Sequence, residues 1–152
     1  MGCWLILHLH GDIFRRMIVS GREEMTDRAG EEAFRQLYLR CRLAATAARQ
    51  YCEGGFTVIV QDNYLGKALG DFVDMLKGCT VYVVALCPSV ATVERREAQR
   101  GKKGYTGFDV AGLHSMFMAE TPRLGLWLDT SDLTPEQTVD EILNRTGEAQ
   151  VY

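Results

Sequence analysis

Short apolar runs alternate along this chain with segments that carry a helical pattern. The runs end near residues 10, 60, 86 and 128, and the run 56–60 is apolar almost throughout and rich in β-branched residues. Such a run is typical of a strand covered on both faces, as in a parallel sheet. Apolar residues at three- and four-residue spacing predict helices over about 30–52, 65–76, 89–99 and 110–118. Thr134 and Pro135 mark the start of a final helix, as cap and first residue.

The alternation of strands and helices predicts an α/β fold. Its simplest form is a three-layer structure, in which a parallel sheet joined by right-handed crossovers carries helices on both faces. A length of 152 residues with 47% apolar content fits one domain over residues 1–152.

Charge and cysteine content narrow the expected partners and compartment. A net charge of -3, with both signs interspersed, argues against nucleic acid or an anionic membrane as a partner. The five cysteines are odd in number and lack a C-x-x-C spacing, which favours buried free thiols in the reducing cytoplasm. The apolar run near the start is too short to span a membrane. We therefore expect a soluble cytoplasmic protein.

Two of the predicted strands end in an aspartate, Asp12 and Asp62. Ligands of α/β proteins bind in the crevice outside the carboxyl ends of the strands, so these acids are candidates for chemistry. Asp12 is followed by Arg15 and Arg16, and such a group can accept a hydroxyl proton and stabilise a transferring phosphoryl group. Asp62 can orient magnesium. The alternatives are a helix cap with solvent-exposed arginines and an ordinary turn.

A third candidate is the basic segment that ends the helix at 89–99. Arg95, Arg96 and Arg100 precede the glycine-flanked loop 101–104, which contains two lysines. A loop of this kind can close over a polyphosphate and exclude water. A solvated helix face explains the same charges.

His8, His10 and Asp12 occupy alternate strand positions and so share one face. This arrangement leaves a metal-dependent hydrolase open as an alternative. Residue 13 is Ile, however, and His114 is the one remaining histidine, so few ligands are left to complete a metal site. The sequence also contains no G-x-x-x-x-G-K-[ST] phosphate loop.

Four segments together resemble the small P-loop kinases of the chloramphenicol phosphotransferase-like group, which are related to adenylylsulfate kinases and zeta-toxin-type kinases. They are His10-Gly11-Asp12-Ile13-Phe14-Arg15-Arg16-Met17-Ile18-Val19-Ser20-Gly21-Arg22, Val60-Gln61-Asp62, Val93-Glu94-Arg95-Arg96 and Leu126-Trp127-Leu128-Asp129-Thr130-Ser131. The resemblance runs from about His8 onward. It implies ATP-dependent phosphorylation of a hydroxyl on a small molecule, with Mg²⁺.

The resemblance also implies roles for individual residues. Asp12 is similar to the base that accepts the substrate proton, and Asp62 to the acid that organises magnesium beside the phosphate loop. The implied substrate or phosphate contacts are Arg15, Arg16 and Arg22. The implied lid, which closes over the phosphates, consists of Arg95, Arg96 and Arg100 with Lys102 and Lys103. The implied adenine edge, where the base of the nucleotide binds, consists of Asp129, Thr130 and Ser131.

One part of the family pattern is not found in this sequence. Family members carry a central first strand, the phosphate loop and its helix ahead of the segment that here begins near Leu5. Without that strand, we expect the strands ending at Val60 and Leu86 either to pair directly or to leave a gap that another chain fills, giving an oligomer through unpaired edges. The chain is then an active phosphotransferase, a truncated or inactive form of one, or a non-catalytic nucleotide-binding or regulatory protein.

Overall fold

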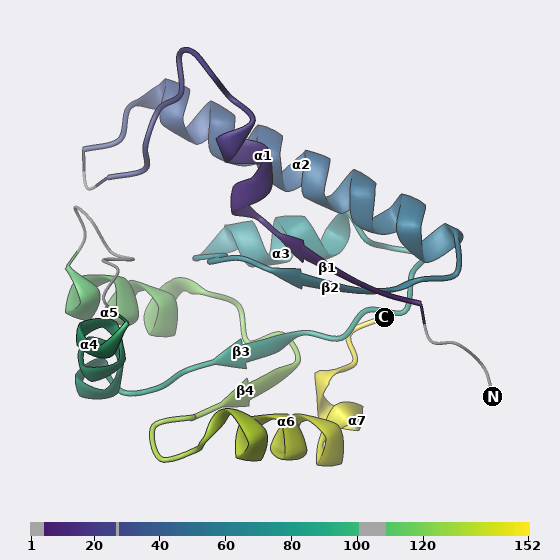
Figure 1. Cartoon of the computed structure of the whole chain (residues 1–152), viewed down its shortest axis with the longest axis vertical. Helices are drawn as coiled ribbons and strands as arrows, with labels where there is room; N and C mark the ends of the chain where they lie inside the picture. The colour runs from purple at the N-terminus through teal and green to yellow at the C-terminus, as the bar shows by residue number, and fades with distance from the viewer. Residues whose placement is uncertain (1–4, 27, 101–108) are drawn as a thin grey trace. The chain divides into compact units, whose positions relative to one another are not determined.

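The computed structural model describes residues 5–26, 28–100 and 109–152. These residues form two compact units, of which the first holds the described residues up to 64 together with 71–79, and the second holds 65–70 and the described residues from 80 to 152. Helices alternate with parallel strands (Figure 1), which confirms the α/β class. The elements are β1 (Ile6–His10), α1 (Asp12–Arg16), α2 (Glu31–Glu53), β2 (Thr57–Gln61), α3 (Lys67–Asp74), β3 (Val84–Leu86), α4 (Val90–Gln99), α5 (Val110–Glu120), β4 (Leu126–Leu128), α6 (Pro135–Asn144) and α7 (Thr146–Ala149).

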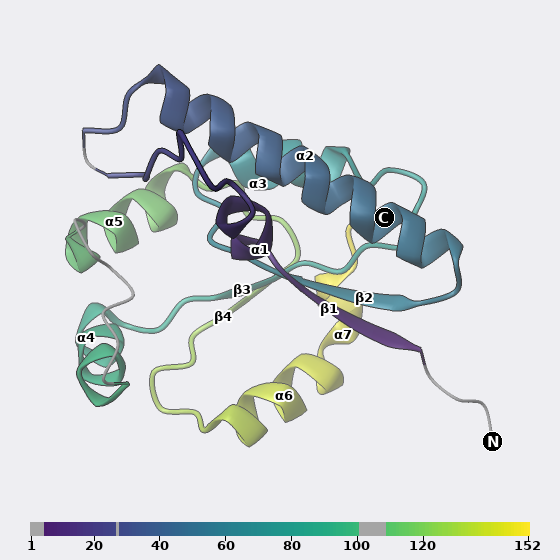
Figure 2. The same cartoon turned by 45° about the horizontal axis from the view of Figure 1, so that its top comes forward.

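The first unit is built on the parallel pair of β1 and β2. Their register runs from Ile6 opposite Thr57 to His10 opposite Gln61. The long helix α2 lies along this pair (Figure 2) and packs against it with a stripe of small residues. Short side chains in this stripe let the helix approach the strands closely. The buried members of the stripe are Ala33, Cys41, Ala44, Ala45 and Ala48.

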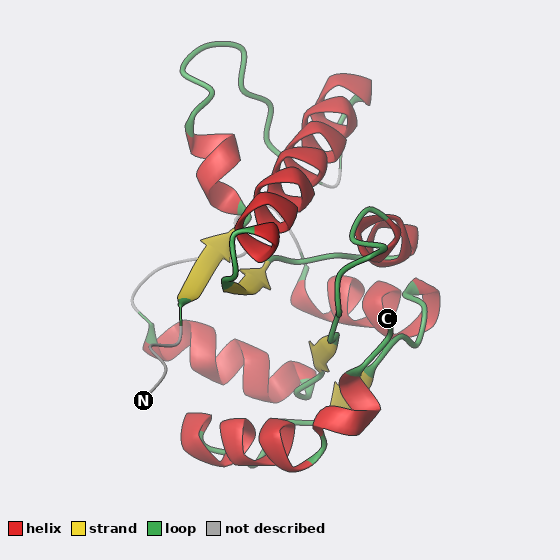
Figure 3. Ribbon diagram, turned by 90° about the vertical axis from the view of Figure 1, so that its right-hand side faces the viewer, coloured by secondary structure: helices red, strands yellow, loops and turns green. Residues whose placement is uncertain are grey.

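The second unit is built on β3 and β4, which are also parallel, from Val84 opposite Leu126 to Leu86 opposite Leu128. These strands are short, as the yellow arrows in Figure 3 show. Ser89 caps α4 by accepting a hydrogen bond from the Thr92 N–H. Thr134 and Gln137 form a capping box at the start of α6. Both helix starts match the expectation from the sequence.

The expected single sheet is not seen among the described residues. Their strands form two separate two-stranded sheets, in the orders β1-β2 and β3-β4, so β2 and β3 are not neighbours. The three-layer arrangement is therefore not confirmed. Direct pairing of the strands that end near Val60 and Leu86, one of the two expected outcomes, does not occur in the described part of the chain.

Several elements differ from the expectation, and the largest differences are in β3 and α1. The strand expected to end near residue 86 is regular only from Val84, because the residues before it bond to the segment 149–152. Val81 and Val83 donate backbone N–H groups to the carbonyls of Tyr152 and Ala149, at N···O distances of 3.1 and 2.8 Å. The short helix α1 was not expected. In the described ranges, no helix combines the length and apolarity that crossing a membrane requires.

Candidate active site at the end of β1 and β2

Asp12 and Asp62 lie together at one edge of the β1-β2 pair. The two strands are parallel, so their carboxyl ends meet, and the Gly11 N–H donates to the Gln61 carbonyl at 2.9 Å, one step beyond the last paired residues. A Cβ atom on Gly11 would stand 1.9 Å from Oδ2 of Asp62. Glycine is therefore required at this position for the Asp62 carboxylate to lie where it does.

Arg40, from the middle of α2, connects the two acids. Its Nη1 donates to Oδ1 of Asp12 and its Nη2 donates to Oδ1 of Asp62, each at 3.4 Å. The side chain of Arg40 is 16% exposed, that of Asp62 10% and that of Asp12 31%. One guanidinium thus bridges two carboxylates, of which Asp12 is the one more accessible to a ligand.

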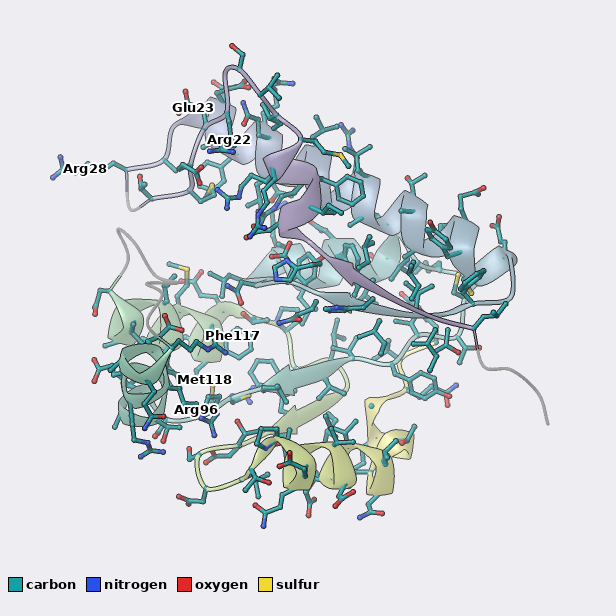
Figure 4. The ribbon with its side chains drawn as sticks, in the orientation of Figure 1. Arg22, Glu23, Arg28, Arg96, Phe117 and Met118 are labelled. Atoms are coloured by element: carbon teal, nitrogen blue, oxygen red, sulfur yellow. The ribbon has the colours of Figure 1, made fainter. Side chains whose placement is uncertain are left out.

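Arg15 contacts Asp12 from the other side. Its Nε donates to Oδ1 of Asp12 at 3.2 Å, and its Nη2 donates to Oδ2 at 3.4 Å. The remaining nitrogen of Arg15 pairs with Glu24, which also pairs with Nε of Arg22 at 3.1 Å. A chain of charges therefore runs from Asp12 to the loop between α1 and α2, where Figure 4 places Arg22.

The electrostatic surroundings keep Asp12 ionised. Partial burial raises its pKa, but the hydrogen bonds and charge of Arg15, with the charges of Arg40 and His10, outweigh burial and hold the pKa below its ordinary value. The same pairing raises the pKa of Arg15, against the opposing effect of its burial. At neutral pH the site therefore holds a carboxylate that accepts hydrogen bonds.

Gln36 on α2 holds the loop that carries Arg22 and Glu24. Its Nε2 donates to the Gly21 carbonyl at 2.8 Å, and its Oε1 accepts from the Glu23 N–H at 3.0 Å. Arg16, at the end of α1, is exposed. The loop from α1 to α2 is thus attached to the same helix that supplies Arg40.

Tyr64 and Cys41 lie close enough to Asp62 to feel its charge. The ring of Tyr64 stacks on Phe72 with centroids 4.4 Å apart, and the Tyr64 hydroxyl is buried with no hydrogen-bond partner in the described residues. Burial, assisted by the charge of Asp62, raises the pKa of Tyr64 above its ordinary range. Burial also raises the pKa of the Cys41 thiol. Both groups therefore stay neutral beside the charged cluster, which consists of Asp12, Arg15, Arg40 and Asp62.

The predicted lid arginines belong to the second unit. Arg96 (Figure 4) donates through Nη2 to the carbonyls of Thr130 and Leu133, at 2.6 and 3.3 Å. Arg95 donates to the Thr92 hydroxyl at 3.3 Å, and Arg100 pairs with Glu97 at 3.2 Å. The contacts of Arg96 stabilise the loop that follows β4. Lys102 and Lys103 lie outside the described residues.

The predicted adenine edge is a compact turn after β4. The N–H and hydroxyl of Ser131 both donate to Oδ1 of Asp129, at 2.8 and 2.5 Å, and these bonds lower the pKa of Asp129. The Ser131 hydroxyl also accepts from the Ser89 N–H at 2.9 Å, and Thr130 is buried. The polar groups of this turn therefore bind one another and the start of α4.

The two acids do not provide a direct magnesium site. Both oxygens of Asp12 and Oδ1 of Asp62 accept from guanidinium groups, and Oδ1 of Asp62 also accepts from the Asn63 N–H at 2.8 Å. The positive charge of Arg40, which contacts both acids, opposes the binding of a second cation beside them. We therefore assign no step to a metal held by Asp62.

The histidines of β1 are also engaged by neighbouring groups. The His8 ring is 3.2 Å from Oε1 of Gln61, and Nδ1 of His10 accepts from the Asp12 N–H at 3.3 Å. Nowhere in the described ranges do three His, Cys, Asp or Glu side chains gather as metal ligands.

Sequence reasoning missed Arg40, Glu24 and Gln36. Arg40 carried a readable signal, because it lies three residues after Leu37 and four before Ala44, within the apolar stripe of α2. A charged residue in such a stripe requires a partner when the helix packs. Nothing in the local pattern marks Glu24 or Gln36.

Comparison with known proteins supports the resemblance seen in the sequence. The family model described as chloramphenicol phosphotransferase-like protein matches residues 2–146. A search of curated proteins found no match. The family match covers nearly the whole chain, including both units and all four motif segments. The chain therefore belongs to the chloramphenicol phosphotransferase-like protein family.

Proposed function

We propose that this chain transfers a phosphoryl group from ATP to a hydroxyl of a small molecule, with Asp12 as the group that accepts the hydroxyl proton. Membership of the family supports a phosphotransferase. The observation that carries the proposal is the Asp12 carboxylate, partly exposed at the end of β1 and contacted by two guanidinium groups. The end of a parallel strand is where α/β enzymes place such a group.

The lowered pKa of Asp12 fits this role. The carboxylate is ionised at neutral pH and can accept a hydrogen bond from the acceptor hydroxyl. As the hydroxyl oxygen bonds to the γ-phosphorus, the bond to the leaving oxygen of ADP breaks and the proton passes to Asp12. A weak base suffices because phosphoryl transfer depends mainly on positioning and on charge stabilisation.

The remaining predicted residues enter as parts of the proposal. Arg15 holds Asp12, while Arg16 and Arg22 contribute positive charge on the acceptor side. The nucleotide side comprises Arg95, Arg96, Arg100, Asp129, Thr130 and Ser131. Magnesium enters with ATP and not as a ligand of Asp62.

Turnover with a panel of hydroxylated acceptors tests the proposal. The protein is incubated with ATP and Mg²⁺, and phosphorylated product is followed by ³¹P NMR. Asp12→Asn should lower kcat by roughly 10²- to 10⁴-fold, the usual contribution of a positioned acid or base. Asp140→Asn, which alters an exposed carboxylate on α6, serves as the matched control. Turnover that survives Asp12→Asn would exclude Asp12 as the base.

A second candidate function is nucleotide binding without catalysis. It is favoured by the sequence, which contains no phosphate-loop motif to hold the β- and γ-phosphates. Calorimetry with ATP and Mg²⁺ and turnover with the panel of acceptors together distinguish the two functions. Binding of ATP with no product from any acceptor supports the regulatory function, whereas product formation rejects it.

A further inference from the structure

Arg40 stands apart from the other arginines of the cluster because its position is set by the core of the first unit. It follows Leu37 by three residues and precedes Ala44 by four, so it projects from the face of α2 that packs on the strands. Its neighbour Cys41 is buried, and Nε of Arg40 is itself buried with no hydrogen-bond partner in the described residues. The guanidinium is therefore held in place chiefly by the two carboxylates.

The guanidinium is suited to fix the two carboxylates relative to each other. Its Nη atoms belong to one rigid planar group, and each donates to a different acid at 3.4 Å. Asp62 is restrained further by the Asn63 N–H and by its close approach to Gly11. Asp12 has no such backbone restraint among the described residues. Because Arg40 binds both acids, the restraints on Asp62 also restrain the position of Asp12.

Arg15 does not duplicate this function. It extends from the short helix α1, and it divides its donors between Asp12 and Glu24. Within the described part of the chain, Arg15 forms no hydrogen bond or ion pair with Asp62, so it does not link Asp12 to the acid that follows β2. The charged or titratable groups that face Asp12 are thus Arg15 from α1, Arg40 from α2 and His10 from β1, with Asp62 beyond Arg40.

We propose that Arg40 is a positioning residue that fixes Asp12 for proton acceptance by tying it to Asp62. The proposal rests on the proposed function, in which Asp12 receives the proton of the acceptor hydroxyl. Arg40 does not contact the reacting atoms. Its loss should therefore reduce the rate of transfer more than the binding of the acceptor, because a small misplacement of a catalytic group slows the reaction strongly.

Kinetics of Arg40 variants test the proposal. Arg40→Gln should lower kcat by roughly 10- to 100-fold and change KM for the acceptor by less than about 3-fold. Arg40→Lys, which keeps the charge but lacks the planar fork, should recover only part of the rate. Arg42→Gln, an exposed arginine two residues along the same helix, should behave as wild type. A rise in KM at unchanged kcat, or full rescue by lysine, would overturn the positioning role.

A readout independent of activity separates this proposal from the proposed function. The carboxyl carbon of Asp12 is followed by ¹³C NMR during a pH titration of each variant. Loss of Arg40 should raise the pKa of Asp12 toward its ordinary value, and Arg42→Gln should not. If the wild type shows no turnover, the proposed function fails but this shift still decides whether Arg40 controls Asp12. If the Asp12 titration is the same in wild type and Arg40→Gln, the proposal is wrong. Should Arg40→Gln fail to fold, the rate of Arg40→Lys decides the proposal, since full activity in that variant would show that the planar guanidinium is not needed to position Asp12.

Discussion

The carboxyl ends of the two parallel strand pairs differ in what their arginines bind. After β1 and β2, Arg40 and Arg15 bind the carboxylates Asp12 and Asp62. After β3 and β4, Arg96 binds backbone carbonyls. An arginine that binds carbonyls stabilises a loop, whereas the arginines that bind Asp12 also lower the pKa of its carboxyl group. The same strand arrangement therefore places arginines against carboxylates in one unit and against the backbone of a turn in the other.

Substitution of one glycine in each unit should give the largest changes in stability at the two strand ends. A Cβ on Gly125 would lie 2.3 Å from the Val83 carbonyl oxygen, at a residue with φ of +67°, whereas on Gly11 it would meet the movable Asp62 side chain. Gly125→Ala should therefore lower the free energy of unfolding by about 2–4 kcal/mol, and Gly11→Ala by about 1–3 kcal/mol. Urea denaturation measures both.

Gly125→Ala should be the less stable of the two variants, whereas Gly11→Ala should be the less active. Gly11→Ala displaces Asp62 and should lose most of its activity, while folded Gly125→Ala should retain more. Gly147→Ala, where an added Cβ meets nothing within 4 Å, is the control for both. Full activity in Gly11→Ala would show that the position of Asp62 does not matter for transfer.

Neutralising one acid in each unit should give a smaller difference in stability between the two units. Asp62→Asn leaves Arg40 with a single carboxylate in a mostly buried place and should cost about 2–3 kcal/mol of stability. Asp129→Asn removes an exposed carboxylate that bonds to Ser131, and should change stability little. Thermal or urea unfolding of the two variants measures the difference, and equal losses would contradict the distinction between the units.

The pH dependence of stability should give the smallest effect. Because folding lowers the pKa of Asp12, the unfolded chain takes up the proton at a higher pH than the folded chain does. The contribution of Asp12 is thus complete above about pH 5 and is lost as the pH falls below about 4, through the lowered pKa. High salt should shrink this contribution, since it screens the partly exposed pair. Unfolding of wild type and Asp12→Asn from pH 2 to 7 measures it, and parallel curves would contradict the assignment.

Local pattern was sufficient for the longer helices and for the strand ends. The apolar spacing of α2, the caps Ser89 and Thr134, and the acids after β1 and β2 are each determined by residues near one another in the chain. The shortened β3 was beyond such reasoning, because residues 81–83 bond to the segment 149–152, some 70 positions away. The pairing of Arg40 was likewise beyond local reasoning, since Asp12 and Asp62 lie 28 and 22 residues from it in the chain.

The pairing of Val81 and Val83 with the segment 149–152 also bears on how the chain folds as it is synthesised. The first unit draws its residues from the stretch up to Cys79, whereas the second needs Tyr152 to complete its backbone bonds. Ribosomes add roughly 5–20 residues per second, so the 73 residues from 80 to 152 require about 4–15 s. The unit with the charged cluster can therefore form on the ribosome while the other still lacks its last segment.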